Sequence, residues 1–86
     1  MPSKILIADD EQDIAAMLRQ FFTSKGYQVL TAANGEQALN QAEKSPDLIL
    51  LDIQMPDMDG LEVCRRIRDY VSCPILFLTA RIEESD

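Results

Sequence analysis

The sequence of 86 residues has little of several features that mark common classes of protein. Its two cysteines, Cys64 and Cys73, suit neither a disulfide framework nor a zinc site, and they agree with a reducing cytoplasm. No apolar run approaches membrane-spanning length, and residues 1–4 lack the basic and apolar parts of a signal peptide, so no membrane contact is expected. Eight basic residues against 15 acidic ones, and a net charge of −7, argue against a nucleic-acid surface.

Glycine is scarce as well, and its positions do not suit a nucleotide-binding loop. The turn after the first expected strand reads ADDEQ, and no G-K-S or G-K-T motif occurs. The apolar share of 47% is ordinary for a globular protein, and the length allows one domain with a modest core. The acidic excess fits either good solubility or cation binding, and charge alone does not decide between them.

Hydrophobic periodicity alternates between two patterns along the chain. Short apolar runs, typical of strands, precede segments in which apolar residues recur every three or four positions, as on one helix face. In the first such segment that face carries Ile14, Met17, Leu18, Phe21 and Phe22. The expected strands are residues 4–8, 27–32, 48–52 and 74–79, and the expected helices are 14–25, 36–44 and 61–70, with another beginning in 81–86.

This order of strands and helices predicts an α/β fold with a doubly wound parallel sheet. The first, third and fourth strands are continuous apolar runs, which are typical of strands covered on both faces. The second strand, YQVLTA, is mixed and suits an edge. These compositions favour the strand order 2-1-3-4. The fourth strand then has an interior composition without a following strand to pair with it.

Acidic residues follow two strands that are neighbours in this order. Asp9 and Asp10 end the first strand, and Asp52 ends the third. In open α/β sheets, ligands bind beyond the carboxyl ends of the strands where the strand order reverses, here between the first and third strands. Because neighbouring strands lie about 4.8 Å apart, we expect the three carboxylates to share one crevice. Thr79, which ends the fourth strand, should add a hydroxyl beside them.

The chemistry of such a group favours phosphoryl transfer. Three close carboxylates repel one another unless a cation lies among them, and oxygen ligands with open positions suit Mg²⁺, which prefers one or two carboxylates plus a phosphate. A carboxylate beside the metal can act as a nucleophile toward phosphorus, and a threonine hydroxyl can donate a hydrogen bond to a phosphoryl oxygen. The pattern therefore indicates that Asp52 is there to be phosphorylated.

Each acidic residue also has a simpler structural explanation. Asp10 could be the N-cap of the following helix, which does not exclude metal binding, and Asp52 could be a solvated strand end. Asp57 and Asp59 are expected in a turn. A hydrolase that works through an aspartyl phosphate needs a second aspartate two positions after the nucleophile, where this chain has Gln54.

Three segments together resemble the receiver domain of two-component response regulators. KILIADDE (4–11) resembles its first strand and acidic pair, PDLILLDIQMPDMDG (46–60) its phosphoacceptor segment, and CPILFLTA (73–80) its fourth strand with the switch hydroxyl. The segments follow the family's order and spacing, and the resemblance covers essentially the whole chain. It implies a flavodoxin-like fold and a signalling role rather than an enzyme. The ending LTARIEESD is most similar to the branch whose receivers drive winged-helix DNA-binding domains, which implies control of transcription.

The resemblance also implies roles for single residues. Asp52 would accept a phosphoryl group from a phosphohistidine of a sensor histidine kinase. Thr79 would bind that group, and Ala80 would leave room for it. Arg81 would occupy a position that tunes hydrolysis of the aspartyl phosphate, as would Gln54. The implied Mg²⁺ ligands are Asp10, Asp52, the backbone carbonyl of Gln54 and, through water, Asp9.

The chain departs from the family pattern at its end. The family has a fifth strand and a fifth helix, and the fifth strand carries a lysine that contacts the phosphoryl group. Lys4, Lys25 and Lys44 lie at positions that do not replace it. We therefore expect residues 1–86 to form an incomplete receiver domain that ends at the start of a fourth helix and takes up phosphate slowly. The alternative is a chemically silent interaction module.

Two further expectations concern the partners of this incomplete domain. The uncovered fourth strand should make the fragment associate with itself, because an exposed apolar edge can pair with another chain. DNA would be bound only through a separate effector domain.

Overall fold

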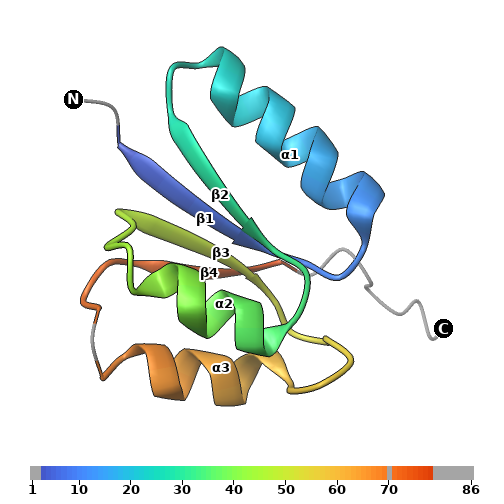
Figure 1. The fold of residues 1–86 in the computed structure, drawn as a ribbon, viewed down its shortest axis with the longest axis vertical. Coiled ribbons are helices and arrows are strands. Elements are labelled where there is room, and N and C mark those ends of the chain that lie inside the picture. The colour runs from blue at the N-terminus through green and yellow to red at the C-terminus, as the bar shows by residue number, and fades with distance from the viewer. Residues whose placement is uncertain (1–2, 70, 79–86) are drawn as a thin grey trace, which may run out of the picture.

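The structure is a computed structural model that describes residues 3–69 and 71–78. Strands and helices alternate along the chain, as the periodicity predicts (Figure 1). The elements are β1 (Lys4–Ala8), α1 (Gln12–Ser24), β2 (Gln28–Ala32), α2 (Gly35–Ala42), β3 (Leu48–Asp52), α3 (Gly60–Ile67) and β4 (Ile75–Leu78). The strands form one parallel sheet in the order β2-β1-β3-β4, which confirms the predicted flavodoxin-like α/β fold.

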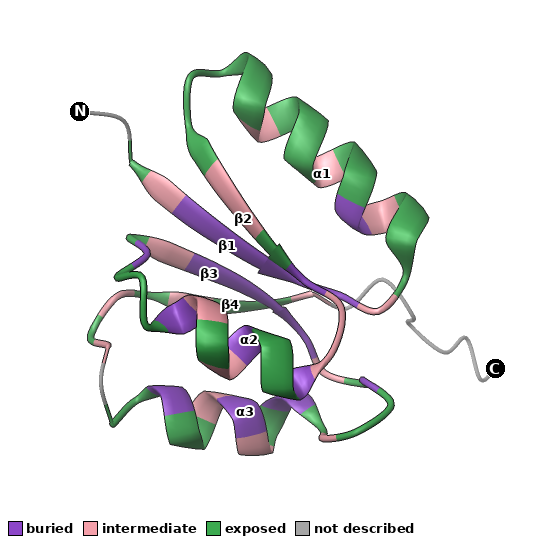
Figure 2. Cartoon of the chain, viewed as in Figure 1, coloured by how far each residue is buried: buried purple, intermediate pink, exposed green. Residues whose placement is uncertain are grey.

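Helices cover both faces of this sheet, with α1 on one face and α2 and α3 on the other (Figure 1). Successive side chains of β1 point to opposite faces, so Ile5 and Ile7 pack with the α1 layer while Leu6 and Ala8 pack with the α2 and α3 layer. Burial is concentrated in β1 and β3 (Figure 2). These two strands are covered on both sides, which is why their sequences read as continuous apolar runs.

The predicted apolar stripe of α1 is only partly buried. Met17 and Phe21 are 61% and 53% exposed. Ala15 is the residue of α1 that belongs to the buried cluster on this face of the sheet. Leu18 and Phe22 are partly buried and pack against that cluster. Among the described residues α1 packs mainly against β2 and β1, and this contact leaves part of its apolar stripe uncovered.

The ends of the helices follow local backbone chemistry. Glu11 is the N-cap of α1 and makes no side-chain capping bond, so the suggestion that Asp10 caps this helix is wrong. The helix stops before Gly26, whose φ of 95° lies in the left-handed region that glycine adopts readily. The last helix is shorter than the predicted 61–70. The Asp69 N–H bonds the carbonyl of Arg66, three residues back, which tightens the final turn.

β4 is an edge of the described sheet and begins at residue 75, one residue later than predicted, while residue 79 of the predicted strand lies outside the described residues. Its Leu76 and Phe77 are 54% and 37% exposed. The predictions for Thr79, Ala80 and Arg81, and for a helix beginning in 81–86, lie outside the described residues. Within the described part of the chain, the helices are too short and too polar to cross a membrane.

Candidate functional site

Asp9, Asp10 and Asp52 meet at the carboxyl end of the sheet, as the sequence predicts. Each offers a carboxylate oxygen, and these oxygens all lie within 4.8 Å of one another. The register of β1 and β3 explains this, because Ala8 pairs with Leu51 and the next residue on each strand is an aspartate. We call these three residues the acidic cluster.

Two members of the acidic cluster are buried, and the backbone orients each of them. Asp9 is 3% exposed and Asp52 is 6% exposed, which excludes a solvated strand end for Asp52. The Oδ1 of Asp9 accepts the N–H of Glu11 at 2.8 Å, and the Oδ1 of Asp52 accepts the N–H of Gln54 at 3.2 Å. Each carboxylate thus bonds the N–H two residues later, a local turn that holds the side chain in one direction.

This donor set fits a hard divalent cation. Carboxylate oxygens are the ligands that Mg²⁺ prefers, and the metal usually keeps several waters beside one or two carboxylates. Negative charges repel more strongly at a buried site than in water because the local dielectric constant is lower. A bound cation would offset that repulsion.

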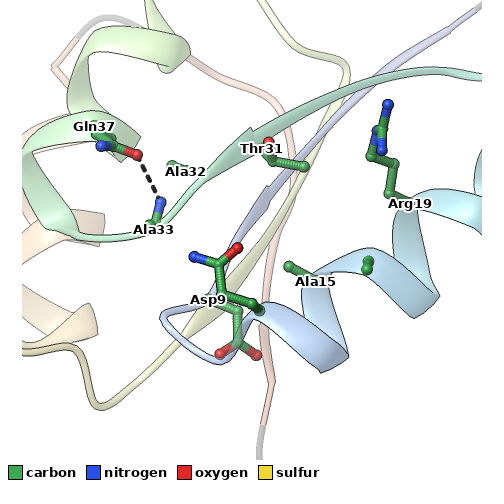
Figure 3. A pocket seen from close by; sticks show the side chains of 9 residues that line it. Asp9, Ala15, Arg19, Thr31, Ala32, Ala33 and Gln37 are labelled. Atoms are coloured by element: carbon green, nitrogen blue, oxygen red, sulfur yellow. Dashed lines mark hydrogen bonds between the residues drawn. The ribbon is translucent and has the colours of Figure 1, made fainter.

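A cavity of about 380 Å³ lies beside the acidic cluster, between α1 and the end of β2 (Figure 3). Asp9 is the member of the cluster that lines it. Gln37 lines the cavity on the side opposite α1, and its Oε1 accepts the N–H of Ala33 at 2.8 Å. The cavity is far larger than one water needs, so water can reach the neighbourhood of the Asp9 side chain.

The loop between β3 and α3, residues 53–59, holds the Asp52 side of the cluster. The N–H of Gly60 donates to the carbonyl of Ile53 at 2.6 Å and closes this loop. A Cβ on Gly60 would lie 2.4 Å from the carbonyl oxygen of Asp52. Glycine is therefore needed here for close approach of two backbone segments. Asp59, expected in a turn, is the N-cap of α3 and accepts the N–H of Glu62 at 2.9 Å.

Arg19 lines the cavity that Asp9 also lines, whereas several other cations make contacts elsewhere in the described chain. The Nζ of Lys4 donates to the carbonyl of Lys44 at 2.7 Å, at the opposite end of the sheet from the cluster. Lys25 lies 5.4 Å from the ring centre of Phe21 at the end of α1. Arg65 and Arg66 both pair with Glu62 on α3. The predicted positions of Lys4 at the far end of the first strand and of Lys25 at the end of the first helix are confirmed.

The sequence did not predict one contact beside the site. The carboxylate of Asp57 accepts the N–H of Gly35 at 2.8 Å and the N–H of Glu36 at 3.1 Å. These residues are 22 and 21 positions apart from Asp57, so no local pattern signals the contact.

Comparison with known families decides what kind of domain carries this site. The family model described as "Response regulator receiver domain" matches residues 5–86. The chain belongs to the response regulator receiver domain family. Domains of this family are signalling domains.

Known receiver domains are similar to this chain in both sequence and fold. This chain is 48% identical over 88 residues to the alkaline phosphatase synthesis transcriptional regulatory protein PhoP of Bacillus subtilis (strain 168). The match covers 100% of this chain and 37% of PhoP. A two-component response regulator from Clostridium difficile superposes with a TM-score of 0.88 at 36% identity, covering 95% of this chain and 69% of that one.

A third similar protein was solved in a modified state. It is a response regulator protein from Burkholderia pseudomallei "with a phosphorylated aspartic acid, calcium ion and citrate". Its TM-score is 0.87 at 26% identity, covering 95% of this chain and 49% of that one. This receiver domain spans little more than a third of the length of PhoP and the other curated relatives it matches.

Proposed function

We propose that this receiver domain is a phosphorylation-dependent switch in a two-component pathway that controls transcription. Asp52 accepts the phosphoryl group, and a sensor histidine kinase supplies it. The observation that carries the proposal is the meeting of Asp9, Asp10 and the buried Asp52 within 4.8 Å at the carboxyl end of the sheet. The phosphorylated aspartate of the Burkholderia pseudomallei protein and the regulatory role named for PhoP support it.

The chemistry requires one nucleophilic oxygen in a fixed direction. The hydrogen bond from the Gln54 N–H holds the Asp52 carboxylate in one orientation. The carboxylate therefore does not have to be reoriented each time the kinase binds. A carboxylate oxygen of Asp52 attacks phosphorus while the bond from phosphorus to the histidine nitrogen of the kinase breaks. The domain is then the acceptor of this transfer, and any later hydrolysis takes place at the same site. The domain therefore needs no enzyme activity besides this transfer and hydrolysis.

The metal would be held by Asp10, Asp52 and the backbone carbonyl of Gln54, with Asp9 acting through water. When bound, Mg²⁺ supplies positive charge that stabilises the oxygens of the transferred phosphoryl group. The cavity beside Asp9 supports the water-mediated role of that residue.

Further roles belong to residues beyond β4. Thr79 would donate its hydroxyl to a phosphoryl oxygen, Ala80 would leave room for the group, and Arg81 would tune hydrolysis together with Gln54. Residues 1–86 would act as a receiver domain in the cytoplasm. With a net charge of −7, they would leave DNA binding to another domain.

Magnesium titration followed by amide chemical shifts tests the metal site. We expect the amides of residues 9–11 and 52–54 to move first and with weak affinity, because few protein ligands replace water on the ion. Shifts confined to the exposed acids Asp57 and Asp59 would contradict the assignment. A parallel titration of the Asp10→Asn variant should show the same shifts only at higher concentrations of magnesium.

A second prediction concerns β4. We propose that the 86-residue chain associates with itself through this strand, since Leu76 and Phe77 expose apolar surface on an edge of the described sheet. Sedimentation across a wide concentration range should show a rising mass, and Leu76→Lys should lower it, because a charge on an edge opposes pairing. A monomer at every concentration, with slowly exchanging amides in β4, would contradict this prediction.

A further inference from the structure

The acidic loop after β3 makes a contact that the phosphoryl chemistry does not use. Asp57, on the loop of residues 53–59, directs both carboxylate oxygens at α2. Oδ1 accepts the N–H of Gly35, and Oδ2 accepts the N–H of Glu36, the first two residues of that helix. We call this pair of bonds the loop clasp. It joins the loop that follows Asp52 to the start of α2, the helix that packs beside α3 on the same face of the sheet.

The packing around Gly35 is an independent sign that the two segments are built to meet. Gly35 is buried, and a Cβ on it would lie 2.8 Å from the Cβ of Met58 and 3.1 Å from the Cγ2 of Val63. The same Cβ would lie 3.3 Å from the Oδ1 of Asp57. The absence of a side chain at position 35 thus lets the loop approach close enough for the clasp to form.

The charge of Asp57 suits this contact. The first N–H groups of a helix lack partners within the helix, and they favour an anion. The hydrogen bond from Gly35 is the main cause that lowers the pKa of the Asp57 carboxyl. α2 already has its own cap, because the side chain of Asn34 accepts the N–H of Gln37 at 2.9 Å. The clasp is therefore an addition to ordinary capping, supplied by a distant loop.

We propose that Asp57 is a positioning residue for the Asp52 site, which it serves by tying the 53–59 loop to α2. The loop carries Gln54, whose N–H orients the Asp52 carboxylate. If the loop were free to move, Gln54 would occupy a wider range of positions. Every contact to the metal that depends on Gln54 would then weaken. This inference rests on the proposed function, because it takes the acidic cluster to be a magnesium site.

Three variants of the 86-residue chain separate positioning from charge and from helix stability. Asp57→Ala removes the clasp together with one negative charge. Gly35→Ala keeps the charge and improves the helix propensity of α2, but it forces the loop away. Asn34→Ala removes a capping bond of the same kind from the same helix without touching the loop. The measurements are magnesium affinity from amide shifts and hydrogen exchange of the amides of residues 35, 36 and 53–58.

We expect Asp57→Ala to weaken magnesium binding by about tenfold, the low end for residues that orient metal ligands. Gly35→Ala should weaken it in the same direction, Asn34→Ala should leave it unchanged, and exchange of the loop amides should quicken only in the first two. Unchanged affinity in Asp57→Ala would overturn the proposal. So would an equal loss in Asn34→Ala, or no loss in Gly35→Ala.

Failure of the proposed function would look different. If the unaltered chain binds no magnesium, the metal site is wrong, and hydrogen exchange still decides on the clasp. Loop amides that exchange at the same rate in Asp57→Ala and in the unaltered chain would then overturn the clasp as well. Faster exchange of the loop amides in Asp57→Ala would show that the loop clasp orders the loop.

Discussion

Replacing Asp52 by asparagine is expected to abolish phosphoryl uptake from a small phosphodonor in the presence of magnesium. Asparagine has nearly the same shape and can still accept the N–H of Gln54, but its neutral amide is not a nucleophile toward phosphorus. Intact-mass spectrometry of the treated protein measures the result. The unaltered chain should gain the mass of one phosphoryl group slowly, and the variant should gain none.

The matched control for this prediction is Asp59→Asn. It removes a carboxylate from the same acidic segment, but asparagine caps helices as well as aspartate does, so α3 should keep its N-cap. Uptake by this variant should equal that of the unaltered chain. Phosphoryl groups that remain on Asp52→Asn, or that disappear from Asp59→Asn, would show that the acceptor has been assigned to the wrong residue.

Gly60→Ala is expected to cause the second large effect, on stability and on the site together. The added Cβ would lie 2.4 Å from the carbonyl oxygen of Asp52 and 2.7 Å from the Cα of Ile53. These are backbone atoms that cannot rotate away, so β3 or the start of α3 must move. We expect a loss of about 1–3 kcal/mol in the free energy of unfolding, typical of overpacking. Urea unfolding measures that loss, and weaker magnesium binding should accompany it.

Gly26→Ala is the control for this variant. Its φ of 95° disfavours alanine by about 1–2 kcal/mol, but nothing lies within 4 Å of the new Cβ. The two variants should therefore lose similar stability, while only Gly60→Ala should weaken magnesium binding. Equal magnesium affinity in both would mean that Gly60 supports the fold without shaping the site.

Much of this architecture could be predicted because it depends on local patterns and on one topological rule. Apolar runs and helical periodicity mark the elements, and the mixed composition of β2 marks an edge. The carboxyl ends of neighbouring parallel strands must meet, so Asp9 and Asp52 had to lie together once their strands were adjacent.

The misses have a different physical origin. Periodicity identifies an apolar face but not how much of it the sheet can cover, so the exposure of Met17 and Phe21 could not be read from α1 alone. The contact from Asp57 to Gly35 joins residues that are distant in sequence. The sequence indicated no special role for Gly60, which allows close approach of the Asp52 backbone, because only the folded arrangement of β3 and α3 reveals that contact.

The most direct test of the central claim is the position of the phosphoryl group on the unaltered chain. The protein is incubated with a small phosphodonor, with and without magnesium, and its peptides are analysed by mass spectrometry. The account predicts one phosphoryl group on Asp52, formed only when magnesium is present. A phosphoryl group on any other residue, or uptake that does not depend on magnesium, would contradict it.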